Sequence, residues 1–246
     1  MQIVILYLIH TNILPTIVLI HIRKDVKMNN MTIKKRRVMT YFIEAANEII
    51  KEEGINGITI RKVADKAGFN SATIYNYFEN LDHLILFAAM KHIKEYALAL
   101  PKYLQNVDNA LDRFIKVWEC FCYYSFKEPE IYYAIFFANL DKDLSEYIGE
   151  YYKLFPEEIG VQPKDVSTML LRHNIYDRGM ALVEECVKEG FIKEEDAETL
   201  NEMCTLIYEG ILQKVIKNKM NTNEAMNKTM KYINLIVENL INKNKI

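Results

Sequence analysis

The sequence predicts an all-α fold in which an N-terminal domain of three short helices precedes a larger helical domain. Apolar residues recur at steps of three and four through most of the 246 residues, which is the spacing of helices with one buried face. Runs that alternate between apolar and polar residues are scarce, and only 8 glycines and 5 prolines interrupt the chain. Half of the residues are hydrophobic, so the chain can bury a substantial core.

The first predicted helix spans about residues 37–53, and local signals define two more behind it. Thr59 can cap a second helix, because its hydroxyl accepts a backbone N–H of the first turn. Gly68 ends that helix, since glycine adopts the left-handed conformation at low cost. Asn70 then caps a third helix over about residues 71–78. Two short helices joined by a tight turn are typical of a helix-turn-helix DNA-binding domain.

The run from Thr59 to Phe78, TIRKVADKAGFNSATIYNYF, resembles the DNA-binding domain of TetR-family transcriptional regulators. The shared pattern is a Ser/Thr-led helix, an A-x-x-A-G turn and a third helix that ends in threonine, an apolar residue, tyrosine, any residue, His or Tyr, and phenylalanine. The resemblance implies DNA contacts of three kinds. They are phosphate contacts at Thr59 and Arg61 (which could also reach a guanine edge), backbone contacts at Thr73, Tyr75 and Tyr77, and base contacts at Ser71, Ala72 and Asn76.

Two departures from the family pattern remove positive charge. The lysine common early on the third helix is Ser71, and the lysine common after the cap of the fourth helix is Leu81. We expect Lys35 and Arg36, within the basic run 34–37, to compensate by lying along the DNA backbone or in the minor groove. A solvated basic tail is the alternative for this run.

The predicted DNA-binding domain covers residues 28–80, and residues 81–246 form the predicted ligand-binding and dimerisation domain. In the second domain we expect helices at about 81–98, 107–126, 129–140, 143–154, 164–188, 194–219 and 223–242.

The beginning of this larger domain is dense in aromatic residues, many of them tyrosines. Aromatic residues at helical spacing are usually core, but a cavity for a mostly apolar ligand needs the same residue types with a few hydroxyls. The TetR resemblance implies such a cavity in this domain. We expect it to be lined by Trp118, Phe121, Cys122, Tyr132, Phe136, Met169, His173 and Tyr176.

The resemblance also implies that the last two helices pair with those of a second subunit as a four-helix bundle. The expected interface residues are Leu200, Cys204, Ile207, Ile211, Val215, Ile233, Ile236, Val237 and Leu240. The alternative is that this stripe packs against the subunit's own core.

Residues 1–27 form an apolar extension that precedes the predicted DNA-binding domain. Met1–Ile22 carries no charge and the pair Arg23-Lys24 follows it, so one interpretation is a membrane anchor. The preferred interpretation is an upstream start that is not used, because Met28 and Met31 offer starts just before the basic run. An ordered extra segment is the third possibility, whereas the lack of a preceding basic region argues against a cleaved signal peptide.

Composition and motifs exclude several function classes. A net charge of −2 does not suit a protein that coats nucleic acid nonspecifically. The sequence has no phosphate-binding glycine loop, metal-spaced cluster or nucleophile signature, so we expect no enzyme activity, cofactor or metal. The four cysteines are expected to be reduced and buried, with redox sensing at Cys120 or Cys122 as the alternative.

The sequence therefore predicts a cytoplasmic, ligand-responsive DNA-binding transcriptional regulator. Its partners would be a palindromic double-stranded DNA operator, a second copy of the chain, and a small, mostly apolar effector that releases a repressor from DNA. A membrane-tethered regulator and a transcriptional activator of the same fold are the alternatives.

Overall fold

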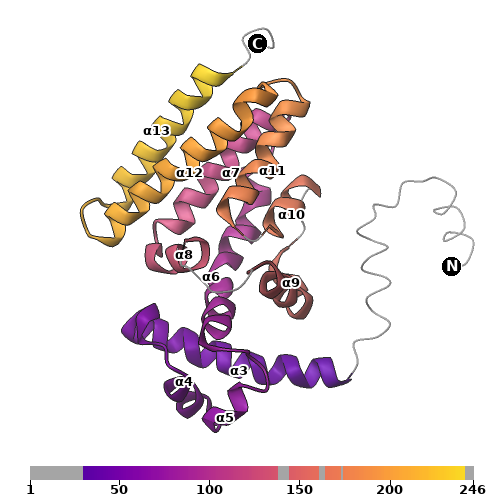
Figure 1. Ribbon diagram of the computed structural model, residues 1–246, viewed down its shortest axis with the longest axis vertical. Coiled ribbons are helices and arrows are strands. Elements are labelled where there is room, and N and C mark those ends of the chain that lie inside the picture. The colour runs from indigo at the N-terminus through magenta and orange to yellow at the C-terminus, as the bar shows by residue number, and fades with distance from the viewer. Residues whose placement is uncertain (1–29, 138–143, 161–163, 173, 242–246) are drawn as a thin grey trace, which may run out of the picture. The chain divides into compact units, whose positions relative to one another are not determined.

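The computed structural model describes residues 30–137, 144–160, 164–172 and 174–241, and these fold into helices joined by loops (Figure 1). Within these ranges, β structure is limited to one isolated bridge between Ile192 and Ile241. The all-α prediction is confirmed. The chain divides into two compact units, residues 1–41 and 42–246. Within the second unit, we call residues 42–80 the head and residues 81–241 the body.

The first described helix, α3, runs from Asn30 to Glu53. It begins earlier than predicted, because the preceding residues include no glycine or proline that would stop it. The basic run 34–37 is therefore helical, and the Thr40 hydroxyl donates a hydrogen bond to the Arg36 carbonyl at 2.9 Å. A 3-10 turn, η1 (Ile55–Gly57), follows α3.

The helix-turn-helix consists of α4 (Ile60–Ala67) and α5 (Ser71–Ile74). The predicted caps form. The Thr59 hydroxyl accepts the Lys62 N–H at 3.2 Å, and the Asn70 side chain accepts the Ala72 N–H at 2.8 Å. Gly68 has φ 75, the left-handed conformation that ends α4. The third helix is shorter than predicted and continues beyond Ile74 as turns.

The body begins with α6 (Leu81–Tyr103), whose cap, Asn80, accepts the His83 N–H at 2.8 Å. This helix continues past its predicted end at residue 98 and includes Pro101 in its last turns, where Leu100 is fully buried. Three helices follow, together with a 3-10 turn. They are α7 (Ala110–Ser125), α8 (Pro129–Phe136), α9 (Leu144–Leu154) and η2 (Pro156–Glu158).

The predicted helix over 164–188 is two helices, α10 (Lys164–Leu170) and α11 (Ile175–Lys188). The break arises because Asn174 caps a new helix by accepting the Asp177 N–H at 2.7 Å.

The last two helices are α12 (Glu194–Ile216) and α13 (Thr222–Leu240). Helix α11 packs on α7 and α12, and α13 packs on α7 and α12, so these helices lie alongside one another in Figure 1. At the centre of the core, five rings have centroids 5.0 to 6.0 Å from that of Phe121. They belong to Tyr96, Trp118, Tyr132, Phe136 and Tyr208.

The cysteines Cys120, Cys122, Cys186 and Cys204 are buried and outside disulfides. Burial raises the pKa of the Cys120 thiol to about 12 and that of Cys122 well above its ordinary value. Both therefore stay as unreactive thiols at neutral pH, which argues against redox sensing.

In the described part of the chain, no helix is long and apolar enough to cross a membrane. The predicted extension over residues 1–27 lies outside the described residues.

Candidate functional site

Helix α4 is held on α3 by ion pairs that use its inner cations. The Lys66 ammonium lies 3.0 Å from a Glu52 carboxylate oxygen and 3.2 Å from one of Glu48. These bonds raise the pKa of Lys66, Glu52 contributing most. Lys62 pairs in the same way with Glu53. The two lysines thus position α4 against α3. The side chains on the outer side of α4 take no part in these ion pairs.

Arg61 lies on that outer side, where its side chain is 89% exposed and its Nε is 3.8 Å from a carboxylate oxygen of Asp65. An exposed pair of this kind is weak, so the guanidinium can exchange it for a phosphate or a base edge.

The segment from Ser71 to Phe78 has one buried and one exposed face. Ile74 and Phe78 are buried, and the Phe78 ring lies edge-on to Phe42 with centroids 6.2 Å apart. Tyr75 is 59% exposed. The other predicted DNA-contacting residues are exposed (Thr59, Ala72, Asn76) or partly exposed (Ser71, Thr73, Tyr77). The outer face of the helix-turn-helix therefore carries hydroxyl, amide and guanidinium groups, which suit phosphate and base contacts.

Lys35 and Arg36 lie on helical turns of α3 and are partly exposed. The basic run is thus part of a helix, which fixes the spacing of these cations along one element.

His92 on α6 connects the head to the body. Its Nε2 lies 2.6 Å from Asn47 Oδ1, and its Nδ1 lies 2.9 Å from Glu128 Oε1. Asn47 presents oxygen to the ring because its own amide nitrogen donates to the Ile43 carbonyl at 2.9 Å. Both ring nitrogens thus face side-chain oxygen atoms, one from α3 and one from the residue that precedes α8. Helix α6 is tied in this way to α3 and to the start of α8.

A second connection joins the head to α9. The Tyr147 hydroxyl donates to a carboxylate oxygen of Glu79 at 2.8 Å, just before α6 begins. The Tyr147 ring also stacks on His83, with centroids 4.1 Å apart. The start of α6 is thereby fixed against the body.

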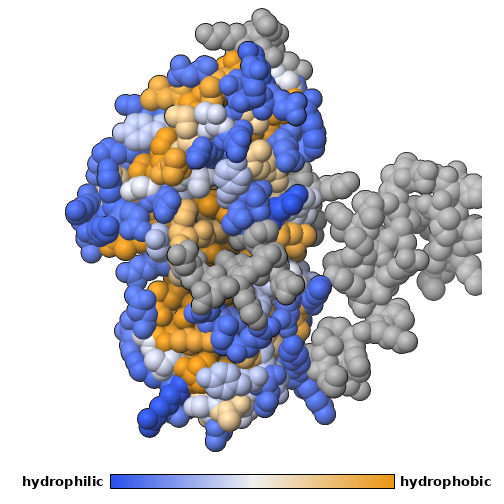
Figure 2. All heavy atoms as spheres, in the orientation of Figure 1, coloured by the Kyte–Doolittle hydropathy of each residue, from blue (hydrophilic) through white to orange (hydrophobic). Residues whose placement is uncertain are grey.

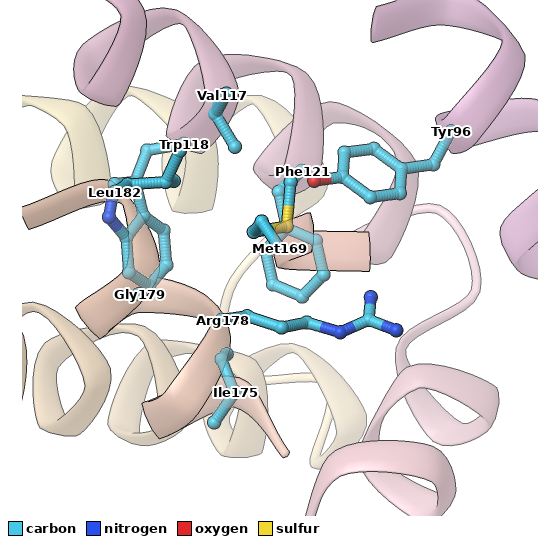
Figure 3. Close-up of a pocket in the computed structure, with 9 residues that line it drawn as sticks. All are labelled: Tyr96, Val117, Trp118, Phe121, Met169, Ile175, Arg178, Gly179 and Leu182. Atoms are coloured by element: carbon cyan, nitrogen blue, oxygen red, sulfur yellow. The ribbon is translucent and has the colours of Figure 1, made fainter. Parts of the chain in front are cut away.

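A cavity of about 30 Å³ lies inside the body, with room for about two water molecules (Figure 3). It is bounded by α6, α7, α10 and α11. Its lining residues are Tyr96, Val117, Trp118, Phe121, Met169, Ile175, Arg178, Gly179 and Leu182. In Figure 3, Trp118 and Leu182 lie toward one side of the cavity, and Tyr96 and the Arg178 guanidinium toward the other.

Arg178 is a buried cation in this wall. Its Nε donates to the Arg172 carbonyl at 2.9 Å and its Nη2 to the Leu170 carbonyl at 3.0 Å, so it caps the C-terminal end of α10. Its guanidinium carbon lies 4.9 Å from the centroid of the Phe136 ring. Within the described residues, Nη1 has no hydrogen-bond partner. Burial lowers the pKa of this guanidinium.

Comparison with protein families identifies the head. Residues 42–87 match the family described as bacterial regulatory proteins, tetR family. Residues 42–87 therefore have the sequence of a TetR-family DNA-binding domain. The resemblance inferred from the helix-turn-helix sequence is therefore confirmed, and the match includes both the recognition segment and the start of α6.

Solved structures show that the TetR fold extends through the body. A TetR transcription regulator from Haloarcula marismortui ATCC 43049 has a TM-score of 0.54 at 14% identity, covering 84% of this chain and 99% of that one. A protein of unknown function from Rhodococcus sp. RHA1 gives 0.53 at 14%, covering 83% and 96%. Thermus thermophilus FadR, a TetR-family repressor solved in complex with lauroyl-CoA, gives 0.52 at 12%, covering 79% and 92%. No curated protein matches the chain.

The cavity in the body includes only part of the predicted lining. Trp118, Phe121 and Met169 are in its wall. Tyr132 and Phe136 lie one layer behind, packed on Phe121 with centroids 5.6 and 5.4 Å away.

Cys122 and Tyr176 are not among the described lining residues of the cavity. Cys122 is fully buried outside the cavity, because its position on α7 faces the core between helices. Tyr176 is partly exposed on the first turn of α11, with its hydroxyl 3.4 Å from a Glu198 carboxylate oxygen. His173 lies outside the described residues.

Arg178 and Gly179 line the cavity but were not among the predicted lining residues, although the sequence carries one signal for Arg178. Arg178 stands three residues after Ile175 and four before Leu182, so a cation occupies the apolar stripe of a helix. Such a position predicts a buried charge with a specific role. Position 179 requires glycine for a steric reason, since a Cβ there would lie 2.0 Å from Asn201 Oδ1 on α12.

Most of the predicted dimer stripe is buried within the single subunit, and pairing through these two helices stays a prediction. Leu200, Cys204 and Ile233 have no exposed surface within the single subunit, because α12 and α13 bury this stripe against the body. Ile211, Ile236 and Val237 are buried in the same way, and Ile207, Val215 and Leu240 are partly exposed.

A different apolar set on the same two helices is exposed. Leu206 is 59% exposed, and Met203, Tyr232 and Leu235 are exposed as well. Figure 2 shows apolar patches among polar side chains in the region of α12 and α13.

Proposed function

We propose that this TetR-family protein is a ligand-responsive regulator that binds a near-palindromic operator as a homodimer and is released by a small molecule. Repression is the proposed outcome of operator binding. The observation that carries the proposal is the division of the helix-turn-helix into a buried face at Ile74 and Phe78 and an exposed polar face around Tyr75.

The proposed DNA contacts come from this exposed face. Ser71, Ala72 and Asn76 stand where base edges would meet the recognition segment. Thr59, Thr73 and the two tyrosines, Tyr75 and Tyr77, would contact the backbone, and Arg61 would reach a phosphate or a guanine. Lys35 and Arg36 on α3 add positive charge for the phosphates.

The proposed dimer uses the exposed apolar residues of α12 and α13. A second copy can cover the exposed apolar residues Met203, Leu206, Tyr232 and Leu235. It cannot reach the stripe at Leu200, because that stripe is buried within the subunit. Two heads in such a dimer would enter successive major grooves about 34–36 Å apart.

The proposed release mechanism runs through α6. Tyr96 of α6 lines the cavity, and His92 of the same helix bonds to the head at Asn47. A ligand that shifts α6 would therefore change the separation of the heads. A coupling free energy of about 1–3 kcal/mol is typical for such a link and is sufficient to release DNA.

The test is selection of operator DNA from a random library by the full chain, followed by footprinting and binding titrations. We expect a two-fold symmetric footprint. Tyr75→Ala and Arg61→Ala should each weaken binding by about tenfold, the loss of one charge-assisted or phosphate-positioning contact.

Matched controls are Tyr123→Ala and Arg172→Ala, which remove exposed residues of the same types from the body. Unchanged operator affinity in both head variants, with intact secondary structure, would remove the basis for these roles.

A further inference from the structure

We propose that the body cavity binds an apolar molecule bearing one carboxylate, and that Arg178 pairs with this carboxylate. The inference rests on the proposed ligand response and specifies its chemistry. It follows from a buried cation that has no counter-ion among the described residues, from the composition of the cavity wall, and from a hydroxyl in that wall.

The positive charge of Arg178 is buried without an anionic partner among the described residues. Among the described residues its partners are two main-chain carbonyls and the face of Phe136, and none of them is a carboxylate. The groups that act electrostatically on it are Tyr152, Tyr96 and Tyr132. A guanidinium stays protonated in a protein, and burying it without an anion is costly. The site therefore favours an incoming negative charge.

The guanidinium of Arg178 has donors left over for a ligand. A guanidinium has five N–H donors, and capping α10 occupies Nε and Nη2. Nη1 is buried and has no described partner, although Arg178 lines the cavity. A carboxylate reaching this nitrogen would satisfy its donors and compensate its charge together.

The wall determines the rest of the ligand. Arg178 is the one charged residue among the nine described lining residues, and Val117, Trp118, Leu182 and their neighbours are apolar. Tyr96 contributes a hydroxyl that points into the cavity (Figure 3). One cation with one hydroxyl matches a monoanion, while a phosphate dianion would need more donors.

The volume of the cavity limits how much of a ligand fits without rearrangement. The free volume of about 30 Å³ holds the head of a ligand but no long apolar tail. Met169 lies in the wall, and its unbranched thioether can move aside more easily than a branched side chain. Entry of a tail would displace such groups and act on α6 through Tyr96.

The chain contains its own reporter. Trp118 is the only tryptophan in the sequence and lies in the cavity wall. Its fluorescence can follow ligand entry in the full chain without DNA. Binding is thus measured separately from operator recognition, so failure of this inference and failure of the proposed DNA binding are distinguishable.

The experiment titrates the full chain with hexanoate, octanoate, decanoate and benzoate, each against its matching alcohol, and with octylamine. The carboxylates should bind about tenfold to a hundredfold more tightly than the alcohols, which is the value of a charge-assisted hydrogen bond. Octylamine should bind most weakly, since its ammonium would meet a second cation.

Arg178→Gln should abolish the preference, so that carboxylate and alcohol bind within about twofold of each other. The control Arg172→Gln removes an exposed arginine nearby and should keep the preference. If Arg178→Gln does not fold, Arg178→Lys serves instead, with a smaller preference because lysine lacks the planar fork.

Three results would overturn the proposal. They are equal binding of carboxylates and alcohols by the unsubstituted chain, no binding of any carboxylate in the series, and a full preference retained in a folded Arg178 variant. A preference that disappears with Arg178 and survives in the Arg172 control would support it.

Discussion

The recognition segment and the cavity wall carry their functional side chains in opposite environments. In the head, Tyr75 projects into solvent while its neighbours Ile74 and Phe78 hold the segment in place. In the body, Phe121 and Arg178 are both buried and also support the packing around them. The proposed DNA contacts and the packing contacts thus belong to different residues in the head, whereas the proposed ligand contacts and the packing contacts share residues in the body.

The strongest test of this contrast compares one aromatic residue from each region. Phe121→Ala should lower the free energy of unfolding by about 3–5 kcal/mol, because Phe121 is at the centre of the aromatic core. Tyr75→Ala should change it by no more than about 0.5 kcal/mol. Urea unfolding followed by circular dichroism measures both, and similar losses in the two variants would contradict the contrast.

A second test examines how closely the cavity wall is packed. Gly179→Ala should destabilise the protein by about 1–3 kcal/mol, since the new methyl would collide with Asn201. Gly149→Ala on α9 is the control, because nothing lies within 4 Å of the added Cβ and alanine favours a helix by up to about 1 kcal/mol. Thermal unfolding of the pair should shift in opposite directions, and equal shifts would show that the contact between α11 and α12 yields.

The smallest expected effect concerns the head. Asn70→Ala removes the cap of α5 and should cost about 1 kcal/mol. The loss should be local, so the Ala72 amide exchanges its hydrogen faster while amides in the body are unaffected. Asn227→Ala, an exposed change on α13, is the control. A uniform increase in exchange throughout the chain would mean that head and body unfold together.

The same contrast explains what the sequence could predict. Thr59, Gly68, Asn70 and Asn80 act on neighbours within a few residues, so their types define the head before any packing is known. Asn174 is a cap of the same kind, and overlooking it merged α10 with α11.

The cavity and the dimer face depend on contacts between distant segments. Periodicity predicted an apolar stripe through Leu200, but a stripe does not specify whether its own subunit or a partner covers it. The exposed apolar residues Met203 and Leu206 lie on the same helix outside this buried stripe, and only the packing of α12 on the body distinguishes the two sets. The place of Arg178 on an apolar stripe indicates burial, but the sequence does not specify which cavity and which partners the guanidinium faces.

The bridge from Asn47 through His92 to Glu128 has a consequence for protein engineering. A hybrid sensor made by exchanging heads between regulators would inherit this body's response only if the donor head supplies an acceptor at position 47. Joining the two proteins at the loop before α6 would replace Asn47, because this partner of His92 lies on α3 in the head. A donor head with an amide or carboxylate side chain at position 47 could form the same hydrogen bond to His92 of the body.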